Sequence, residues 1–249
     1  MLDPRSVEDA GADFALRIME RLALILPSGD LGFTSTASIV KDTAFVVISQ
    51  SDELGLELTV KGQPLLRLVV EYRCMLSTFS KMLTVSGSTY KVYLHGSRYP
   101  IFAADYDRSA RPNTPAAHWN VYANRKDVTD SLRRAGSSRR GGRNRRAARD
   151  RSSGVVGTLH FPVGGHRYRP CLEDVLELVW TEYGIDVRTK SARKAIDDGR
   201  REWRTYQLKA AVSDDPRSAA EELHRLGVPI DMAAFPVDLG ERPDRTTAW

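Results

Sequence analysis

The sequence predicts an α+β fold: an N-terminal helix, a curved and mostly antiparallel sheet of six to eight strands, and a helical C-terminal third. Apolar residues recur at helical spacing up to Pro27, alternate with polar residues between about residues 36 and 124, and return to helical spacing after Pro170. Short turns join the central strands. Such turns connect antiparallel neighbours, because parallel strands need long crossovers.

The N-terminal segment has the pattern of an amphipathic helix. Ser6 suits the N-cap position, with Asp9 three residues later, and Pro27-Ser28-Gly29 is a sequence that ends a helix. The apolar stripe between these signals consists of Val7, Phe14, Ile18, Leu22 and Ile25, with Ala15 and Met19 beside it. We expect this helix to cover the sheet.

The middle of the chain contains segments with the alternation or the β-branched content of strands. We expect strands at 43–49, 54–60, 65–72, 81–85, 89–95, 99–104, 118–123 and 155–163. A turn is expected over Lys61–Pro64, and Ser86-Gly87-Ser88 has the composition of a short hairpin loop. If the strand at 155–163 rejoins the sheet, the segment before it is a long loop between neighbouring strands.

The C-terminal third carries three helical patterns, at 170–183, 189–212 and 215–226, with Gly184 and Gly227 ending the first and the third. The domain organisation follows from these patterns. We expect residues 1–132 to hold the first helix and the sheet, 133–154 to form an Arg-rich flexible insert, 155–228 to add a strand and helices on the same core, and 229–249 to be a tail.

The Arg-rich insert is the most unusual feature of the chain. Its nine arginines against one acid, Asp150, give it a charge of +8, so the rest of a chain with net charge +5 carries −3. These arginines are Arg133, Arg134, Arg139, Arg140, Arg143, Arg145, Arg146, Arg149 and Arg151. Because residues 133–153 include no aromatic residue, leucine or aliphatic β-branched residue, we expect a solvated loop.

Three interpretations of this insert remain open. Mobile arginines neutralise phosphates and release counterions, which gives sequence-independent binding of RNA or DNA. The same charge suits an acidic protein partner. Codon bias is the third explanation, since arginine outnumbers lysine 29 to 8 as in a GC-rich bacterial or phage genome. Without aromatic residues in the insert, any base stacking has to come from elsewhere.

A second cationic motif lies between the last expected strand and the next helix. Gly164, Gly165, His166, Arg167 and Arg169 combine flexible backbone, positive charge and a helix N-terminus, a pattern that suits a phosphate or carboxylate. An ordinary strand-to-helix connection is the alternative, because Glu173 and Asp174 compete for the helix dipole. Farther along, Arg193, Arg200 and Arg204 share a helix face and either extend the basic surface or form ion pairs.

Two histidines are weak catalytic candidates. His118 shares a strand face with Asn120 and Tyr122, and His160 lies on the polar face of the last strand, so paired strands would bring an acid and a base together. Structural histidines are the alternative. Two-histidine phosphoesterases carry a hydroxyl residue two positions after each histidine. The sequence has Asn120 and Pro162 there and does not match that family.

Other sites are not indicated. Cys74 and Cys171 are far apart and lack metal spacing, Asp105 and Asp107 form only a weak carboxylate pair, and no cofactor signature occurs. No uninterrupted apolar run reaches membrane-spanning length, and we expect neither membrane nor cofactor.

We therefore expect a non-enzymatic, cytoplasmic bacterial or phage protein that binds nucleic acid. One alternative is a protein–protein regulator such as an antitoxin or a phage-defence component. The other is an enzyme acting on a nucleotide or RNA. The oligomeric state stays open.

Overall fold

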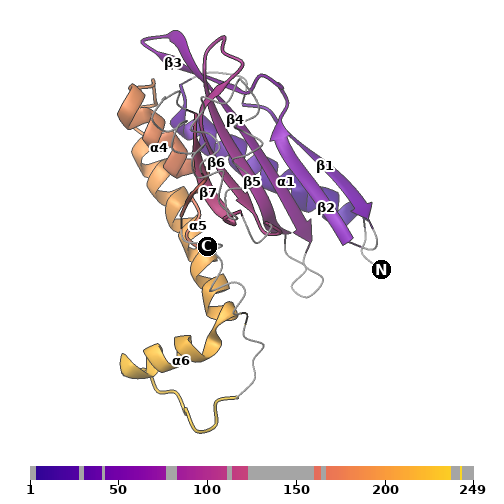
Figure 1. The fold of residues 1–249 in the computed structure, drawn as a ribbon, viewed down its shortest axis with the longest axis vertical. Helices are drawn as coiled ribbons and strands as arrows, with labels where there is room; N and C mark the ends of the chain where they lie inside the picture. The colour runs from indigo at the N-terminus through magenta and orange to yellow at the C-terminus, as the bar shows by residue number, and fades with distance from the viewer. Residues whose placement is uncertain are drawn as a thin grey trace, which may run out of the picture.

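The computed structural model describes residues 4–27, 31–40, 43–76, 83–110, 114–122, 160–163, 167–236 and 242. It confirms the α+β class. Helix α1 (Pro4–Ile25) precedes an eight-stranded antiparallel sheet, and helices α4 (Leu172–Tyr183), α5 (Ala192–Asp214) and α6 (Pro216–Arg225) follow it. Figure 1 shows α5 running past the end of the sheet, with α6 beyond it.

The strands follow each other through the sheet almost in sequence order. They are β1 (Phe33–Val40), β2 (Thr43–Gln50), β3 (Leu56–Val60), β4 (Gln63–Leu76), β5 (Leu83–Leu94), β6 (Pro100–Asp107), β7 (Ala117–Val121) and β8 (His160–Pro162). The order is β1-β2-β4-β5-β6-β7-β8, with β3 paired to the first part of β4. All pairs are antiparallel, as the short connections predicted.

The predicted hairpin at Ser86-Gly87-Ser88 is wrong, because residues 83–94 form one continuous strand. The irregularity that the composition indicates is a bulge: the register with β4 shifts between Arg73 and Cys74. A Cβ atom on Gly87 would lie 2.7–2.9 Å from the Arg73 guanidinium. The glycine therefore permits a close cross-strand contact and does not form a turn.

The predicted turn at Lys61 is confirmed, and a residue distant in the sequence, Asp186, binds it. Lys61 and Gly62 connect β3 to β4 with positive φ angles of 52° and 74°, a conformation that matches the twist of two-residue hairpins. The carboxylate of Asp186, which follows α4, accepts hydrogen bonds from both turn N–H groups and from the Thr59 hydroxyl. This carboxylate fixes the α4–α5 connection to the end of the sheet.

The described helices that contact the sheet pack on one of its faces. Tyr72 of β4, Ser88 of β5 and Tyr106 of β6 lie opposite one another in register and so share a face. Phe14 of α1 packs edge-on against Tyr72, with ring centroids 5.1 Å apart, and α5 approaches Tyr106. The core lies between these layers and includes Leu22, Ile48, Leu68, Val70, Tyr90, Leu176 and Ile196. Each such side chain contributes about 1.5–3 kcal/mol on full burial.

Candidate nucleic-acid interface

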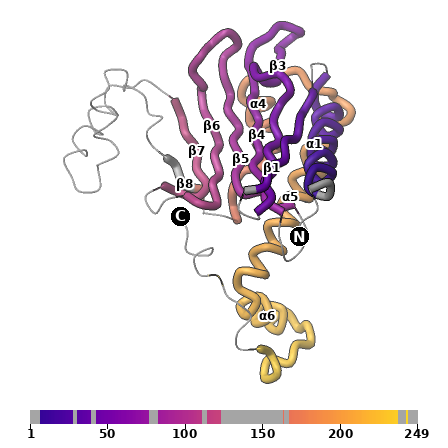
Figure 2. The backbone as a smooth tube through the Cα atoms, turned by 90° about the vertical axis from the view of Figure 1, so that its right-hand side faces the viewer, coloured from indigo at the N-terminus to yellow at the C-terminus, as the bar shows by residue number. Residues whose placement is uncertain are grey.

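The two strands that flank the Arg-rich insert in the sequence lie next to each other in the sheet. Residues 133–153 are outside the described part of the chain, but the strands on either side are described. β7 and β8 are direct antiparallel neighbours, with His118, Trp119 and Asn120 opposite Pro162, Phe161 and His160. The last strand therefore rejoins the sheet, as the sequence suggested. Figure 2 shows this edge at the end of the sheet away from α1.

A polar row lies beside this edge, on the face of the sheet opposite the described helices. His118 is opposite Asp105 of β6, and the Asn120 side-chain amide donates a 2.7 Å hydrogen bond to the Asp105 carboxylate. Although no described helix covers this face, His118 and Asn120 are buried, and the Nδ1 atom of His118 lies 3.0 Å from the carbonyl oxygen of Pro115. The Oδ1 atom of Asn120 is enclosed and meets no hydrogen-bond donor among the described residues.

The two histidines occupy diagonal positions of the paired strands. His118 is opposite Pro162, two residues from His160, so both positions belong to the same face. This register meets the first condition for an acid–base pair, neighbouring strands. The side chain of His160 is outside the described set, and catalysis by the pair stays a prediction.

Two tyrosines stand on the same face as Asp105. Tyr122 follows β7 directly, and burial, together with the negative charge of Asp105 and the nearby Tyr93, raises its pKa. The Arg67 guanidinium lies 5.1 Å from the centre of the Tyr93 ring. Tyr93 was not among the residues predicted from the sequence, although its alternation with Val92 and Leu94 is a usable signal. Both tyrosine side chains are half-buried.

Arg169, predicted to bind an anion, is instead enclosed in the core. Its side chain is only 6% exposed. The guanidinium carbon lies 3.9 Å from the Tyr106 ring centre and 4.8 Å from that of Trp203, and Nη1 donates to the Gln207 side chain at 3.0 Å. Burial lowers the pKa of this guanidinium below its ordinary value. The stacked arginine joins β6 to α5 and does not face an open surface.

The rest of the predicted anion site is divided. Gly164, Gly165 and His166 lie outside the described residues. Arg167 forms a 2.6 Å ion pair with Asp214, which is 1% exposed at the end of α5. At the start of α4, Asp174 accepts the Cys171 backbone N–H at 3.1 Å. An acidic side chain thus already occupies the helix N-terminus, as expected for an ordinary strand-to-helix connection. Anion binding at this motif stays a prediction.

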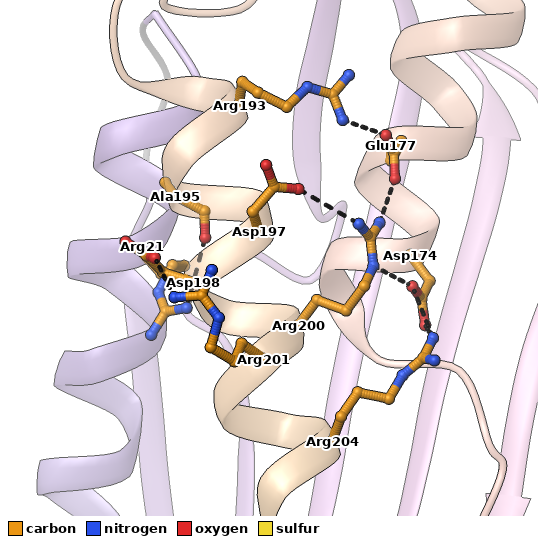
Figure 3. Close-up of polar contacts among 10 residues, drawn as sticks. All are labelled: Arg21, Asp174, Glu177, Arg193, Ala195, Asp197, Asp198, Arg200, Arg201 and Arg204. Carbon is orange, nitrogen blue, oxygen red and sulfur yellow. Dashed lines mark hydrogen bonds and ion pairs between the residues drawn. The ribbon is translucent and has the colours of Figure 1, made fainter.

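The arginines of α5 are engaged in ion pairs, most of them with α4 (Figure 3). Arg200 donates to Asp174 at 2.7 Å and also to Glu177, while Arg193 binds Glu177 and Arg204 lies 3.5 Å from Asp174. On the other side, Arg21 of α1 binds Glu202 at 2.8 Å and lies 3.7 Å from Glu173. These guanidinium groups join α1, α4 and α5, so their charge is largely neutralised.

The cysteines have no features of reactive groups. Both are free and buried. Burial raises the pKa of Cys74 to about 12, and burial together with Glu173 and Asp174 raises that of Cys171 even further, so neither forms a thiolate near neutral pH. Among the described residues, no group of three or more His, Cys, Asp or Glu side chains is arranged to hold a metal ion. Of the two carboxylates considered, Asp105 binds Asn120 and Asp107 binds Ser109.

Comparison with known proteins identifies no relative. No family model, curated protein or solved structure matches this chain. Within the described part, no helix has the length and apolar character needed to cross a membrane.

Replacing Arg169 with alanine is expected to lower the free energy of unfolding by about 2–4 kcal/mol, because it opens a cavity between two rings and leaves Gln207 unpaired. Arg217→Ala, on the exposed surface of α6, is the matched control and should change stability by less than about 0.5 kcal/mol. Urea denaturation followed by tryptophan fluorescence measures both. An Arg169→Ala protein of unchanged stability would show that this side chain is not structural.

Stability should fall in acid partly through Glu177. Hydrogen bonding to Arg193 holds the pKa of Glu177 below its ordinary value. Its stabilising contribution is therefore complete above about pH 4.5 and lost as the pH falls through the folded-state pKa. Glu177→Gln should cost up to about 1 kcal/mol at pH 7 and progressively less towards pH 3. Denaturation curves of both proteins at several pH values measure this difference, and a gap that is constant with pH contradicts the assignment.

Proposed function

We propose that the protein binds single-stranded RNA or DNA through the Arg-rich segment 133–153, which lies in the sequence between two neighbouring strands at one edge of the sheet. The observation that carries this proposal is the direct pairing of β7 with β8. The stretch of chain that contains this segment of charge +8 leaves the sheet after β7 and re-enters it at β8, beside a face that carries tyrosines. The cationic segment and this face then act on one stretch of nucleic acid.

The charge distribution supports the insert as the cationic element. Outside it the chain has a net charge of −3, and the prominent arginines of α1 and α5 in the described part pair with carboxylates. A polyanion is therefore attracted mainly to the insert. Arginine suits this task because its planar guanidinium binds phosphate through two hydrogen bonds and stays protonated.

The face of the sheet that carries Tyr93 and Tyr122 supports binding of single strands in particular. Tyr122 lies immediately before the undescribed segment that contains the insert, and Tyr93 shares its face. In single strands, unpaired bases stack on such rings, whereas the bases of a duplex are already stacked on each other. Phosphate contacts from the insert and stacking on the tyrosines would then act together. The resulting function is binding, without a chemical step.

The buried thiols agree with a reducing compartment. Cys74 and Cys171 are free in the structure, and secreted domains more often use such residues in disulfides. We accordingly place this binding function in the cytoplasm.

A variant with glutamine at all nine arginines of the insert is expected to lose most of its affinity for a single-stranded oligonucleotide. If all nine contact phosphates, the slope of log affinity against log salt should become shallower by about 6 units. Replacement of the same residues by lysine keeps the charge and is the matched control. Fluorescence anisotropy at four or more salt concentrations measures affinity and slope.

The outcomes separate the proposal from its alternatives. Equal affinity in the parent and the glutamine variant would show that the insert does not bind nucleic acid. If the parent binds no oligonucleotide but retains a stoichiometric acidic protein through the insert, the partner is a protein. Loss of affinity in the glutamine variant with retention in the lysine control supports the proposal.

A further inference from the structure

β1, the strand at the edge of the sheet opposite β8, carries no charge or proline that would hinder pairing with another strand. β1 ends the strand order, and its eight residues, Phe-Thr-Ser-Thr-Ala-Ser-Ile-Val, include neither a charged residue nor proline. In a chain that is 28% charged, this is an unusual composition for an edge. Edge strands of monomeric proteins normally carry lysine, proline or a bulge, which prevent pairing with another strand. β1 has no charge or proline of this kind, and its eight pairs with β2 run without a bulge.

The backbone groups that β1 presents outward follow from its pairing with β2. The Ser51 N–H donates to the Gly32 carbonyl at 2.9 Å, so the alternation of an antiparallel ladder turns the groups of Phe33, Ser35, Ala37 and Ile39 away from β2. The Phe33 N–H agrees with this, since it donates to Met19 of α1 and not to β2. For the other three residues, no backbone hydrogen bond to another described element is found.

Helix α1 carries an exposed apolar stripe on the side of this edge. Ala12, Leu16, Met19 and Ala23 follow one another at intervals of four, three and four residues, which places them in one row of the helix. Met19 contacts β1 through the 3.3 Å hydrogen bond from Phe33, and this contact fixes the side of the helix on which the row lies. Leu16 is 49% exposed, and no residue of the row is charged.

We propose that this edge binds a second copy of the chain. In our proposal, β1 pairs with β1 of the second copy in an antiparallel manner around a two-fold axis, and the stripes of the two α1 helices pack on each other. Strand and stripe are uncharged and lie in adjacent layers on one side of the molecule, so one association covers both. The strand edge can pair with the same edge of a second copy, and the apolar stripe can pack on the same stripe, as a contact around a two-fold axis requires.

The outward backbone groups select a register. With the axis at Thr36, Ser35 and Ala37 exchange hydrogen bonds with Ala37 and Ser35 of the second copy. The two Thr36 residues then face each other as a non-hydrogen-bonded pair, and Thr34 faces Ser38 of the second copy. Pairs of threonine and serine side chains are favourable across antiparallel strands. This association does not depend on nucleic-acid binding, since the insert is attached at the opposite edge.

The first test compares two exposed leucines of α1. Leu16 and Leu24 are 49% and 51% exposed, but only Leu16 belongs to the stripe. Sedimentation analysis at roughly 1–100 µM should find a dimer of the parent protein, in a range typical of specific association. Leu16→Glu should raise the dimer dissociation constant at least about tenfold, because two apolar side chains leave and two like charges enter the interface. Leu24→Glu should behave as the parent does.

The second test concerns the register. Thr36→Cys should give a disulfide-linked dimer on mild oxidation, because facing Cα atoms of such a pair lie about 4.5 Å apart, within disulfide range. Thr34→Cys is the control, because about four residues of strand, roughly 13 Å, separate its two copies. The native thiols are buried and do not compete.

The results decide the proposal without ambiguity. A parent protein that is monomeric up to 100 µM, roughly the upper limit for a specific weak dimer, overturns it. A dimer that Leu16→Glu and Leu24→Glu weaken equally, or that Thr36→Cys does not cross-link, places the interface elsewhere and also overturns it. A monomer that binds another protein through β1 would show that the edge takes a foreign strand.

Discussion

Packing of the described helices on one face of the sheet is the constraint on which the other features of this structure depend. Helices α1, α4 and α5 pack on the face that contains Tyr72 and Tyr106, and the core lies between these two layers. A sheet covered in this way keeps one face and two edges for other contacts. The helix layer, in turn, has to accommodate its own charges where the helices meet. The positions of the arginines follow from this division.

Arginines have several distinct roles along the chain. On α1 and α5 it forms ion pairs between helices, so its charge stabilises the helix layer and contributes little to the surface potential. At Arg169 the planar guanidinium fills a gap between two aromatic rings, where its shape matters as much as its charge. In the insert, by contrast, nine arginines stand against a single acidic residue, so nearby residues in the sequence do not balance their charge. A count of basic residues therefore overstates the basic surface, and pairing decides which arginines are available.

The sequence was sufficient for features that depend on local patterns. The buried apolar face of α1, the alternation in β4 and the turn at Lys61 are such features, because each is set by residues that are close in the sequence. β1 was not predicted as a strand of its own, because an edge strand rich in threonine and serine lacks the alternation of apolar and polar residues. β5 was divided at Gly87, since the Arg73 guanidinium that requires a glycine there comes from another strand. The burial of Arg169 depends on Tyr106 and Trp203, which are distant in sequence, so its charge alone suggested a surface site.

The two edges of the sheet differ in a way that matters for function. At β8 only three residues pair, and the chain adjoining this short strand carries the Arg-rich insert. At β1 an uncharged strand of eight residues offers backbone groups for pairing. If two copies associate at β1, their inserts lie at the far ends of a continuous sheet of twice eight strands. A nucleic acid long enough to reach both inserts would then bind twice, and the second contact would form at a high effective concentration. Affinity would increase with the length of the strand, although each insert recognises no sequence of its own.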